Sequence, residues 1–427
     1  MEISGDPAKH VWRLGAAGAL LASAVFLVRP DGLRRVTSWI GLIRSWLRRL
    51  TGRGCLPDDI PGGFLGLIGN TPLIRIESLS RDLGCTVLAK CEFLNPGGSV
   101  KDRVAKSIIE TAEREERLRQ GGCVFEGTSG STGISLALVC NAKKYQCCIF
   151  MPDDQAQEKT DTLRSLGARV AHCKNVSMAD PSHYCRAAEN AADDPALEGR
   201  GFFANQFENT ANFLAHFSGT GEEILRQTNG KVDAFVSAAG TGGTIGGVGA
   251  RLKAHNPDVK IILADPPGSA LAGKASLGVL WTREDREGYR RRIIFDTIAE
   301  GIGLNRLTRN FELAVPFIDE AFRVTDEEAV AMSQYLLRQD GLFVGSSASC
   351  NCVGVVKAVM SGAIPRDSGA VLVTILCDSG MRHLSKFHNR AYLKSMDLLP
   401  PYLDCDDEHG TAACDAPRSV WDFVSLC

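Results

Sequence analysis

The chain has 427 residues, of which 44% are hydrophobic and 23% charged, with a formal net charge of -2. This composition excludes a wholly disordered chain, a collagen-like chain and a polytopic membrane protein, and the balanced charge gives no reason to expect a nucleic-acid partner. The 15 cysteines include no CxxC pair. No metal site is therefore predicted, and we expect free thiols in a reducing compartment.

The beginning of the chain carries a predicted membrane attachment. Residues 14–28 form an uninterrupted apolar run with basic residues on both sides, and residues 37–50 follow with the spacing of a basic amphipathic helix. A membrane span needs about 20 apolar residues, which the run approaches when it is counted from Val11. A cleaved secretory signal and a matrix-targeting presequence are alternatives. The flanking charges favour a retained N-terminal anchor helix.

A linker at residues 57–63 precedes a region in which short apolar runs alternate with helical runs. The predicted strands are residues 86–90, 147–151, 169–172, 234–238, 261–264 and 371–376. One helix is predicted from a cap at Ser99 to Gly121, and another from the capping box of Thr325 and Glu328 to Leu337. Continuous apolar strands between helices indicate an α/β fold with mostly parallel sheets. After residue 400 an acidic, loosely held tail is expected.

A glycine-rich turn follows the predicted strand at residues 234–238 and consists of Gly240, Thr241, Gly242, Gly243 and Thr244. Small residues at a helix N-terminus leave backbone N–H groups free to hold a phosphate, and the two hydroxyls add donors. The turn does not match GxGxxG, which disfavours a dinucleotide. A tight turn without a ligand is the alternative interpretation.

Lys101 stands in the first turn of a predicted helix, after the sequence Asn95-Pro-Gly-Gly-Ser-Val. A lysine at the positive end of a helix is unfavourable unless its charge is lost or used, so a lowered pKa and Schiff-base chemistry are one interpretation. An exposed lysine balanced by Asp102 is the other.

Two loops rich in hydroxyl groups also open predicted helices. The first contains Thr128, Ser129, Ser131 and Thr132 and suits a carboxylate, and the second contains Ser347, whose hydroxyl suits a ring nitrogen. Taken singly, each loop is better interpreted as a helix cap. Together, a phosphate loop, a Schiff-base lysine and a carboxylate loop predict pyridoxal 5'-phosphate acting on an amino acid.

The ordered motifs make the resemblance specific. Residues 64–399 resemble the cysteine synthase and cystathionine β-synthase family of fold type II pyridoxal-phosphate enzymes, and the matching stretches are residues 69–73, 95–103, 128–133, 205–209 and 240–244. Residues 264–267, 300–304 and 376–380 resemble a branch that is anchored in fungal mitochondria and is close to bacterial cysteine desulfhydrases.

The resemblance implies a role for each site residue. Lys101 would bear the cofactor, residues 240–244 would hold its phosphate, Ser131 would contact its ring oxygen and Ser347 would meet its pyridine nitrogen. The substrate carboxylate would contact Thr128, Ser129, Ser131, Thr132 and Gln206. Ser131 replaces an asparagine of the family and Ser349 replaces a glycine, so these two positions depart from the pattern.

The expected organisation has three parts. Residues 1–62 form the anchor, basic helix and linker; residues 63–400 form the catalytic region; and residues 401–427 form the tail. Within the catalytic region we expect a smaller domain at 87–204 and a larger one at 63–86 plus 205–400. The resemblance further implies a homodimer attached to the mitochondrial outer membrane or another intracellular membrane.

The expected activity is β-replacement, which converts O-acetylserine and sulfide to cysteine and acetate. Cysteine desulfhydration is the alternative within the same chemistry. A non-catalytic, membrane-anchored protein that binds a partner is the alternative from another class.

Overall fold

The computed structural model describes residues 61–128, 130–155, 157–178, 180–282, 297–403 and 417–421. The predicted anchor, the basic helix, Ser129 and most of the predicted tail lie outside these ranges. The chain divides into two units, Met1–Ile60 and Pro61–Cys427, and the structure described below belongs to the second. Within the described ranges, no helix has both the length and the apolar character that a membrane crossing requires.

The larger of two sheets contains six strands in the order β1-β2-β10-β7-β8-β9. Their bounds are β1 Leu73–Arg75, β2 Thr86–Cys91, β7 Ala234–Ala238, β8 Lys260–Asp265, β9 Glu320–Arg323 and β10 Val371–Leu376. The β1–β2 pair is antiparallel and every other pair is parallel. The central strands are buried on both faces, as their unbroken apolar sequences predicted.

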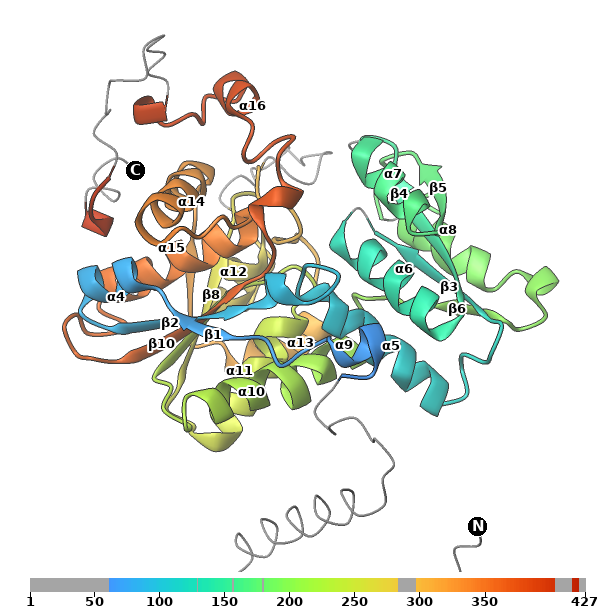
Figure 1. Cartoon of the computed structure of the whole chain (residues 1–427), viewed down its shortest axis with the longest axis horizontal. Coiled ribbons are helices and arrows are strands. Elements are labelled where there is room, and N and C mark those ends of the chain that lie inside the picture. Colours follow the sequence, from blue (N-terminus) through green and yellow to red (C-terminus); the bar gives the residue numbers. More distant parts are fainter. Residues whose placement is uncertain are drawn as a thin grey trace, which may run out of the picture. The chain divides into compact units, whose positions relative to one another are not determined.

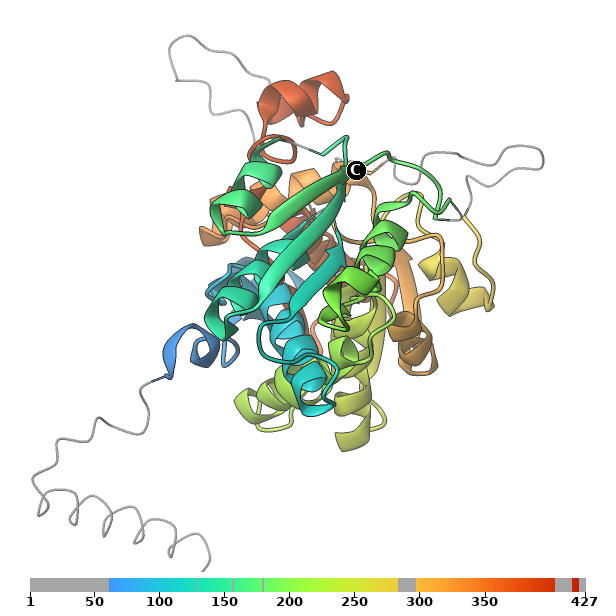
Figure 2. The same cartoon turned by 90° about the vertical axis from the view of Figure 1, so that its right-hand side faces the viewer.

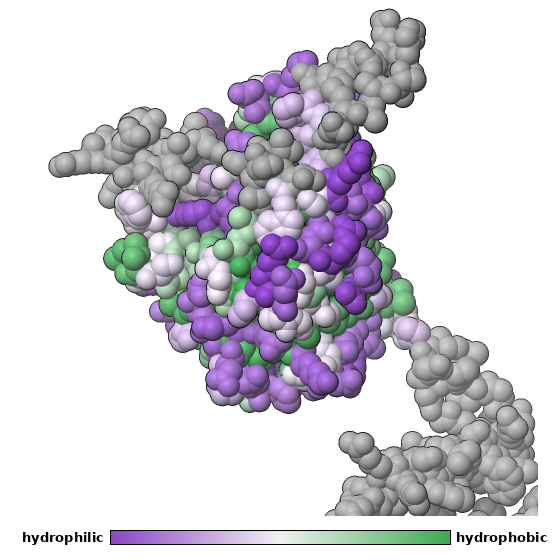
Figure 3. All heavy atoms as spheres, turned by 90° about the vertical axis from the view of Figure 1, so that its left-hand side faces the viewer, coloured by the Kyte–Doolittle hydropathy of each residue, from purple (hydrophilic) through white to green (hydrophobic). Residues whose placement is uncertain are grey.

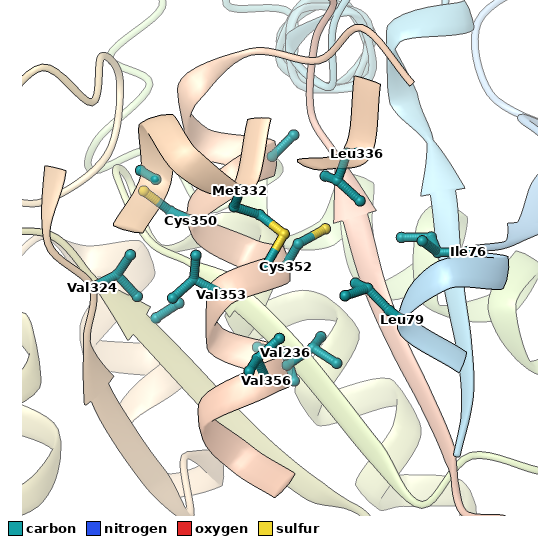
Figure 4. Packing of buried hydrophobic residues seen from close by; sticks show 14 of the residues in the cluster. Ile76, Leu79, Val236, Val324, Met332, Leu336, Cys350, Cys352, Val353 and Val356 are labelled. Carbon is teal, nitrogen blue, oxygen red and sulfur yellow. The ribbon is translucent and has the colours of Figure 1, made fainter. Parts of the chain in front are cut away.

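Helices cover both faces of this sheet (Figure 1). Side chains of α4 (Glu77–Leu83), α14 (Asp326–Asp340) and α15 (Ser346–Met360) pack on one face, where Val236 meets Met332, Cys352 and Val356 (Figure 4). The opposite face packs against α10 (Gly221–Gln227), α11 (Gly243–His255), α12 (Leu271–Leu277) and α13 (Arg309–Ala314). The cysteines in this core act as small apolar residues.

The smaller sheet has four parallel strands in the order β5-β4-β3-β6 and faces the viewer in Figure 2. Its strands are β3 Cys123–Gly127, β4 Gln146–Pro152, β5 Arg169–Cys173 and β6 Gly201–Phe203. Helices α5 (Lys101–Arg114), α6 (Ser131–Lys143) and α7 (Gln157–Ser165) contribute to the core on one face, and α8 (Tyr184–Ala192) packs on the other. Between the sheets in the chain lie α9 (Ala211–Ala215) and a π-helical turn, His216–Thr220.

The remaining regular elements are short. They are α3 (Gly63–Gly66), α16 (Arg390–Ser395) and single 3-10 turns at Glu92–Leu94, Pro195–Leu197, Val315–Phe317, Gly380–Arg382 and Pro401–Leu403. The face shown in Figure 3 mixes hydrophilic and hydrophobic residues, and the hydrophobic ones are interspersed among polar neighbours. The main apolar clusters therefore lie beneath the surface, between the sheets and their helices.

The structure corrects two predicted boundaries. β2 belongs to the larger sheet, so the smaller region begins after Cys91 rather than at residue 87. The helix that begins at Lys101 ends at Arg114, well before the predicted stop at Gly121, because Glu116 takes a positive φ of 58° that an α-helix cannot continue through. The capping box of Thr325 and Glu328 is confirmed, although its helix extends to Asp340.

Candidate active site

The candidate site residues follow the carboxyl ends of parallel strands. β2 leads to Lys101, β3 to the hydroxyl loop, β7 to the glycine-rich turn and β10 to Cys377 and Asp378. In open parallel sheets this edge is where ligands bind. Backbone contacts hold two of these segments together, since Val100 donates its N–H to the Cys377 carbonyl at 3.0 Å and Ser99 pairs with Asp378.

Lys101 is the first residue of α5. The Lys101 backbone N–H donates a hydrogen bond to the Ser99 hydroxyl at 3.3 Å, although Val100, not Ser99, is the capping residue of the helix. Burial lowers the pKa of the Lys101 amine, and the neighbouring Cys377 and Asp378 offset part of that shift. A lowered pKa favours the neutral amine, which is a nucleophile and a base, as the Schiff-base interpretation requires.

A buried ionic network fixes the first turn of α5. The Arg103 guanidinium pairs with Glu92 and with Glu223, each at 2.7 Å, and the Lys90 ammonium pairs with Glu223 at 2.6 Å. Although burial raises the pKa of Glu223, Arg103 and Lys90 lower it to about 2. Because Glu223 lies on α10 and Lys90 on β2, the network attaches the start of α5 to the larger sheet.

The glycines of the glycine-rich turn stand where no side chain could fit without strain or displacement. A Cβ on Gly240 would lie 2.2 Å from the Gly301 carbonyl oxygen, and one on Gly243 would lie 2.0 Å from Asn212 Oδ1. Gly242 has a φ of +89°, which disfavours any L side chain. Thr241 is buried, and its hydroxyl accepts from Asn212 Nδ2 at 2.8 Å. The turn presents backbone N–H groups at the start of the long helix α11, which is a phosphate-binding arrangement.

We expect Gly243→Ala to weaken cofactor binding. The added Cβ would displace Asn212 or the turn, and such overpacking typically costs about 1–3 kcal/mol. The affinity of the apo-protein for pyridoxal phosphate, measured by fluorescence titration, should fall about tenfold or more. Gly62→Ala is the matched control, since nothing lies within 4 Å of its Cβ position. Equal affinity in the two variants would contradict the phosphate assignment.

The structure brings the hydroxyl loop and Gln206 together. Thr132 and Gln206 are buried, and the Thr132 hydroxyl donates to Gln206 Oε1 at 2.6 Å. The Thr128 hydroxyl accepts from the N–H of Gly130 at 3.3 Å. Ser131 opens α6, and its hydroxyl accepts from Arg382 at 2.9 Å. Ser129 lies outside the described residues.

Hydrogen bonds through Asn212 connect Gln206 with the glycine-rich turn. Asn212 Nδ2 donates to the Gln206 carbonyl at 2.9 Å as well as to Thr241. His216 contacts the Thr244 hydroxyl at 3.2 Å, and burial, together with the positive charge of Arg103, lowers its pKa well below the usual value. His216 is therefore a neutral hydrogen-bonding group.

Ser347 is buried at the start of α15. Burial raises the pKa of the adjacent Cys377 thiol to about 11, while a hydrogen bond from Ser347 and the nearby Lys101 act in the opposite direction. Cys377 thus links Ser347 with Lys101, and the thiol remains protonated near neutral pH. Ser349 lies on the same helix, and its hydroxyl donates to the Gly345 carbonyl at 3.1 Å, inside the helix.

Sequence reasoning missed four residues that organise the site: Glu126, Asn212, His216 and Arg382. Glu126 could have been found from the sequence, because it is a charged residue within an apolar run, and glutamate is rarely fully buried unless it has a partner. Asn212, His216 and Arg382 had none, because polar residues in helices and turns usually face solvent and their partners lie far away in the sequence.

These features fit pyridoxal phosphate. The partly buried Lys101 has a lowered pKa, and the glycine turn forms a cradle that a Cβ would fill. When the cofactor is bound, Lys101 would carry it, residues 240–244 would hold its phosphate and Ser347 would face its ring nitrogen.

The family model described as pyridoxal-phosphate dependent enzyme matches residues 64–378. The chain belongs to this family, and its cofactor is pyridoxal 5'-phosphate. The match covers both sheets up to the end of β10 and all the candidate cofactor residues.

Within the family, the chain is similar to cysteine synthases. It is 51% identical over 360 residues to Cysteine synthase 2 of Schizosaccharomyces pombe, covering 83% of this chain and 90% of the relative. It is 48% identical over 342 residues to a Saccharomyces cerevisiae protein named "Putative mitochondrial cysteine synthase", covering 78% and 86%.

A solved structure is also similar. A hydrogen sulfide-producing enzyme from Fusobacterium nucleatum superposes with a TM-score of 0.65 at 30% identity, covering 78% of this chain and 99% of that one. The shared architecture confirms the predicted fold type.

Proposed function

We propose that the protein is a cysteine synthase that catalyses β-replacement, converting O-acetyl-L-serine and sulfide to L-cysteine and acetate. The observation that supports this most directly is a partly buried Lys101 with a lowered pKa, at a site shared with the hydroxyl loop and the glycine-rich turn. The similarity to cysteine synthases at about half identity supports the same substrate class.

Lys101 would act as the general base in this reaction. The cofactor, when bound, draws electrons from the substrate α-carbon and weakens its C–H bond. The Lys101 amine takes the α-proton, acetate leaves the β-carbon, sulfide adds there, and Lys101 returns the proton to the α-carbon. The lowered pKa of Lys101 favours the unprotonated amine, which is the form that accepts a proton.

The carboxylate loop would orient the substrate. The N-terminus of α6 favours an anion, and Thr128, Ser131, Thr132 and Gln206 surround it, with Ser129 as a further proposed contact. Arg382 donates to Ser131 and also to the Gly97 carbonyl, so it connects this loop with the segment before Lys101. Ser347 offers the ring nitrogen a neutral hydroxyl, which limits electron withdrawal and favours chemistry at the β-carbon.

Visible absorption of the purified holoenzyme tests the proposal. O-acetylserine should convert the band of the Lys101-bound cofactor to a new species, and sulfide should restore it with release of cysteine. A band that ignores O-acetylserine but responds to cysteine, with release of sulfide and pyruvate, would overturn β-replacement.

That second outcome defines the alternative function, a cysteine desulfhydrase. It is favoured by the similarity to a hydrogen sulfide-producing enzyme, and it requires the same residues. The non-catalytic alternative loses its basis, since the chain belongs to an enzyme family and Lys101 is present with its surroundings.

We further propose attachment to a membrane through residues 14–28, and assembly as a homodimer. The name of the Saccharomyces cerevisiae relative favours the mitochondrion as the location of this membrane. Carbonate extraction of mitochondria should leave the full-length chain in the membrane fraction and release a variant that lacks residues 1–62; release of both would contradict the anchor.

A further inference from the structure

A buried carboxyl group lies beneath the carboxylate loop. Glu126 is in β3, shortly before Thr128, and its exposed fraction is 0%. It accepts a hydrogen bond from the Gln206 backbone N–H at 3.2 Å, and Gln206 Nε2 lies 3.4 Å from its other oxygen. Among the ion pairs of the described ranges, none includes Glu126.

The surroundings of Glu126 contain no cation that contacts it in the described structure. Tyr184 and Cys185 on α8 are the titratable groups in electrostatic contact with Glu126, and burial raises the pKa of both, that of Cys185 to about 12. Arg306 acts on the same two residues and pairs with Glu208 at 2.7 Å. Ile149 stands opposite Glu126 on β4, and Thr132 on α6 reaches the same Gln206 side chain. Burial raises the pKa of Glu126 to about 8.

The protonation of Glu126 determines what Gln206 can offer a ligand. An ionised Glu126 can only accept, so it holds Gln206 Nε2, and the Gln206 oxygen then takes the Thr132 hydroxyl proton. The Thr132 hydroxyl is then not free to donate to a carboxylate, and only the second N–H of Gln206 remains as a donor. A neutral Glu126 can donate to the Gln206 oxygen once that amide turns by 180°, which leaves its shape almost unchanged. Gln206 then presents N–H and Thr132 keeps its O–H, so two donors face the loop.

We propose that Glu126 is a positioning residue that, as a neutral carboxylic acid, turns the Gln206 amide so that Gln206 and Thr132 both donate to the substrate carboxylate. This inference rests on the proposed function, in which these two residues bind that carboxylate. Substrate binding is therefore coupled to one proton on Glu126 and weakens as the pH rises through the pKa of Glu126 near 8.

Glu126→Gln tests the coupling, because a glutamine amide donates to Gln206 at every pH. The KM for O-acetylserine, as the ratio of wild type to Glu126→Gln, should be near unity at about pH 6.5 and reach about tenfold at about pH 9. Taking the ratio cancels the titration of the substrate's own amino group. A ratio that is independent of pH would overturn the inference.

Two control variants separate positioning from folding and charge. Glu126→Leu removes the donor and should raise KM at all pH values, with less change in kcat. Glu113→Gln removes the same charge on α5, where Glu113 pairs with Lys143, and should follow the wild-type pH profile. A Glu113→Gln profile that matches Glu126→Gln would contradict the assignment to Glu126.

Infrared spectroscopy of the holoenzyme gives a readout that does not depend on activity. A carbonyl stretch of a protonated carboxylic acid should be present at neutral pH, decline with a midpoint at about pH 8 and be missing from Glu126→Gln. A Glu126 that is already ionised at neutral pH would overturn the inference while normal turnover of O-acetylserine leaves the proposed function intact. A wild-type enzyme that ignores O-acetylserine would overturn the proposed function itself.

Discussion

Replacing Lys101 by alanine is expected to reduce turnover by at least about 10³-fold, because one side chain carries both the cofactor and the proton transfer. The variant should bind pyridoxal phosphate without covalent attachment, so borohydride should no longer fix the cofactor to the protein. Steady-state assay with O-acetylserine and sulfide, together with mass spectrometry after borohydride treatment, measures both effects.

Lys106→Ala is the matched control for this variant. Lys106 lies on the same helix, and its amine donates to the Leu65 carbonyl at 3.0 Å, away from the site residues. It should keep wild-type turnover and covalent cofactor attachment. Full turnover by Lys101→Ala would contradict the assignment of Lys101 as the catalytic lysine.

Arg103→Met is expected to destabilise the fold by about 3–5 kcal/mol, because it leaves buried carboxylates without their cation. Glu92 is fully buried and pairs with Arg103 through the guanidinium Nε at 2.7 Å, while Glu223 would keep Lys90 as a cation and the hydrogen bond from the Asn70 N–H. Chemical denaturation followed by circular dichroism measures the change in the free energy of unfolding. Arg251→Met removes a more exposed pair with Glu222 and should cost less than about 1 kcal/mol.

The same variant should also change the response to acid. Glu223 has a pKa of about 2 in the folded chain, below its ordinary value of 4.5, so it stabilises the wild type above pH 4.5 and loses that contribution as the pH falls toward 2. Without Arg103 this pKa should rise, and the stability deficit of Arg103→Met should shrink in acid. A deficit that is constant from neutral pH to pH 3 would show that lost packing, rather than lost charge pairing, causes it.

The strands that were easiest to predict from the sequence have mostly apolar runs, such as β7 and β10. β1 and β6 escaped because each has only three residues, and β9 because it is a half-buried edge strand. β3 escaped because Glu126 interrupts its apolar pattern, although the strand is buried throughout. Glu126, which made this strand hard to predict, is also the residue to which we assign a positioning role.

The site residues that lie within one short motif could be predicted from the sequence. Those whose hydrogen-bonding or charged partners are distant in the sequence could not. The glycine turn and Lys101 are local signals. The contact of Arg382 with Ser131 joins residues 251 positions apart, and the network of Glu92, Arg103 and Glu223 depends on how three elements pack. Spacing in a single sequence does not encode such distances.

The place of β10 in the larger sheet has a consequence for biosynthesis. β10 pairs with β2 on one side and β7 on the other, yet among the strands of the described residues it is the last to be made. Until residues 371–376 leave the ribosome, β2 and β7 lack their partner and expose backbone edges that can pair with other chains. Cys377 and Asp378, the neighbours of Lys101, arrive with the same segment. A nascent chain stalled before residue 371 should therefore depend on chaperones and carry an incomplete site, and activity should appear only with the final strand.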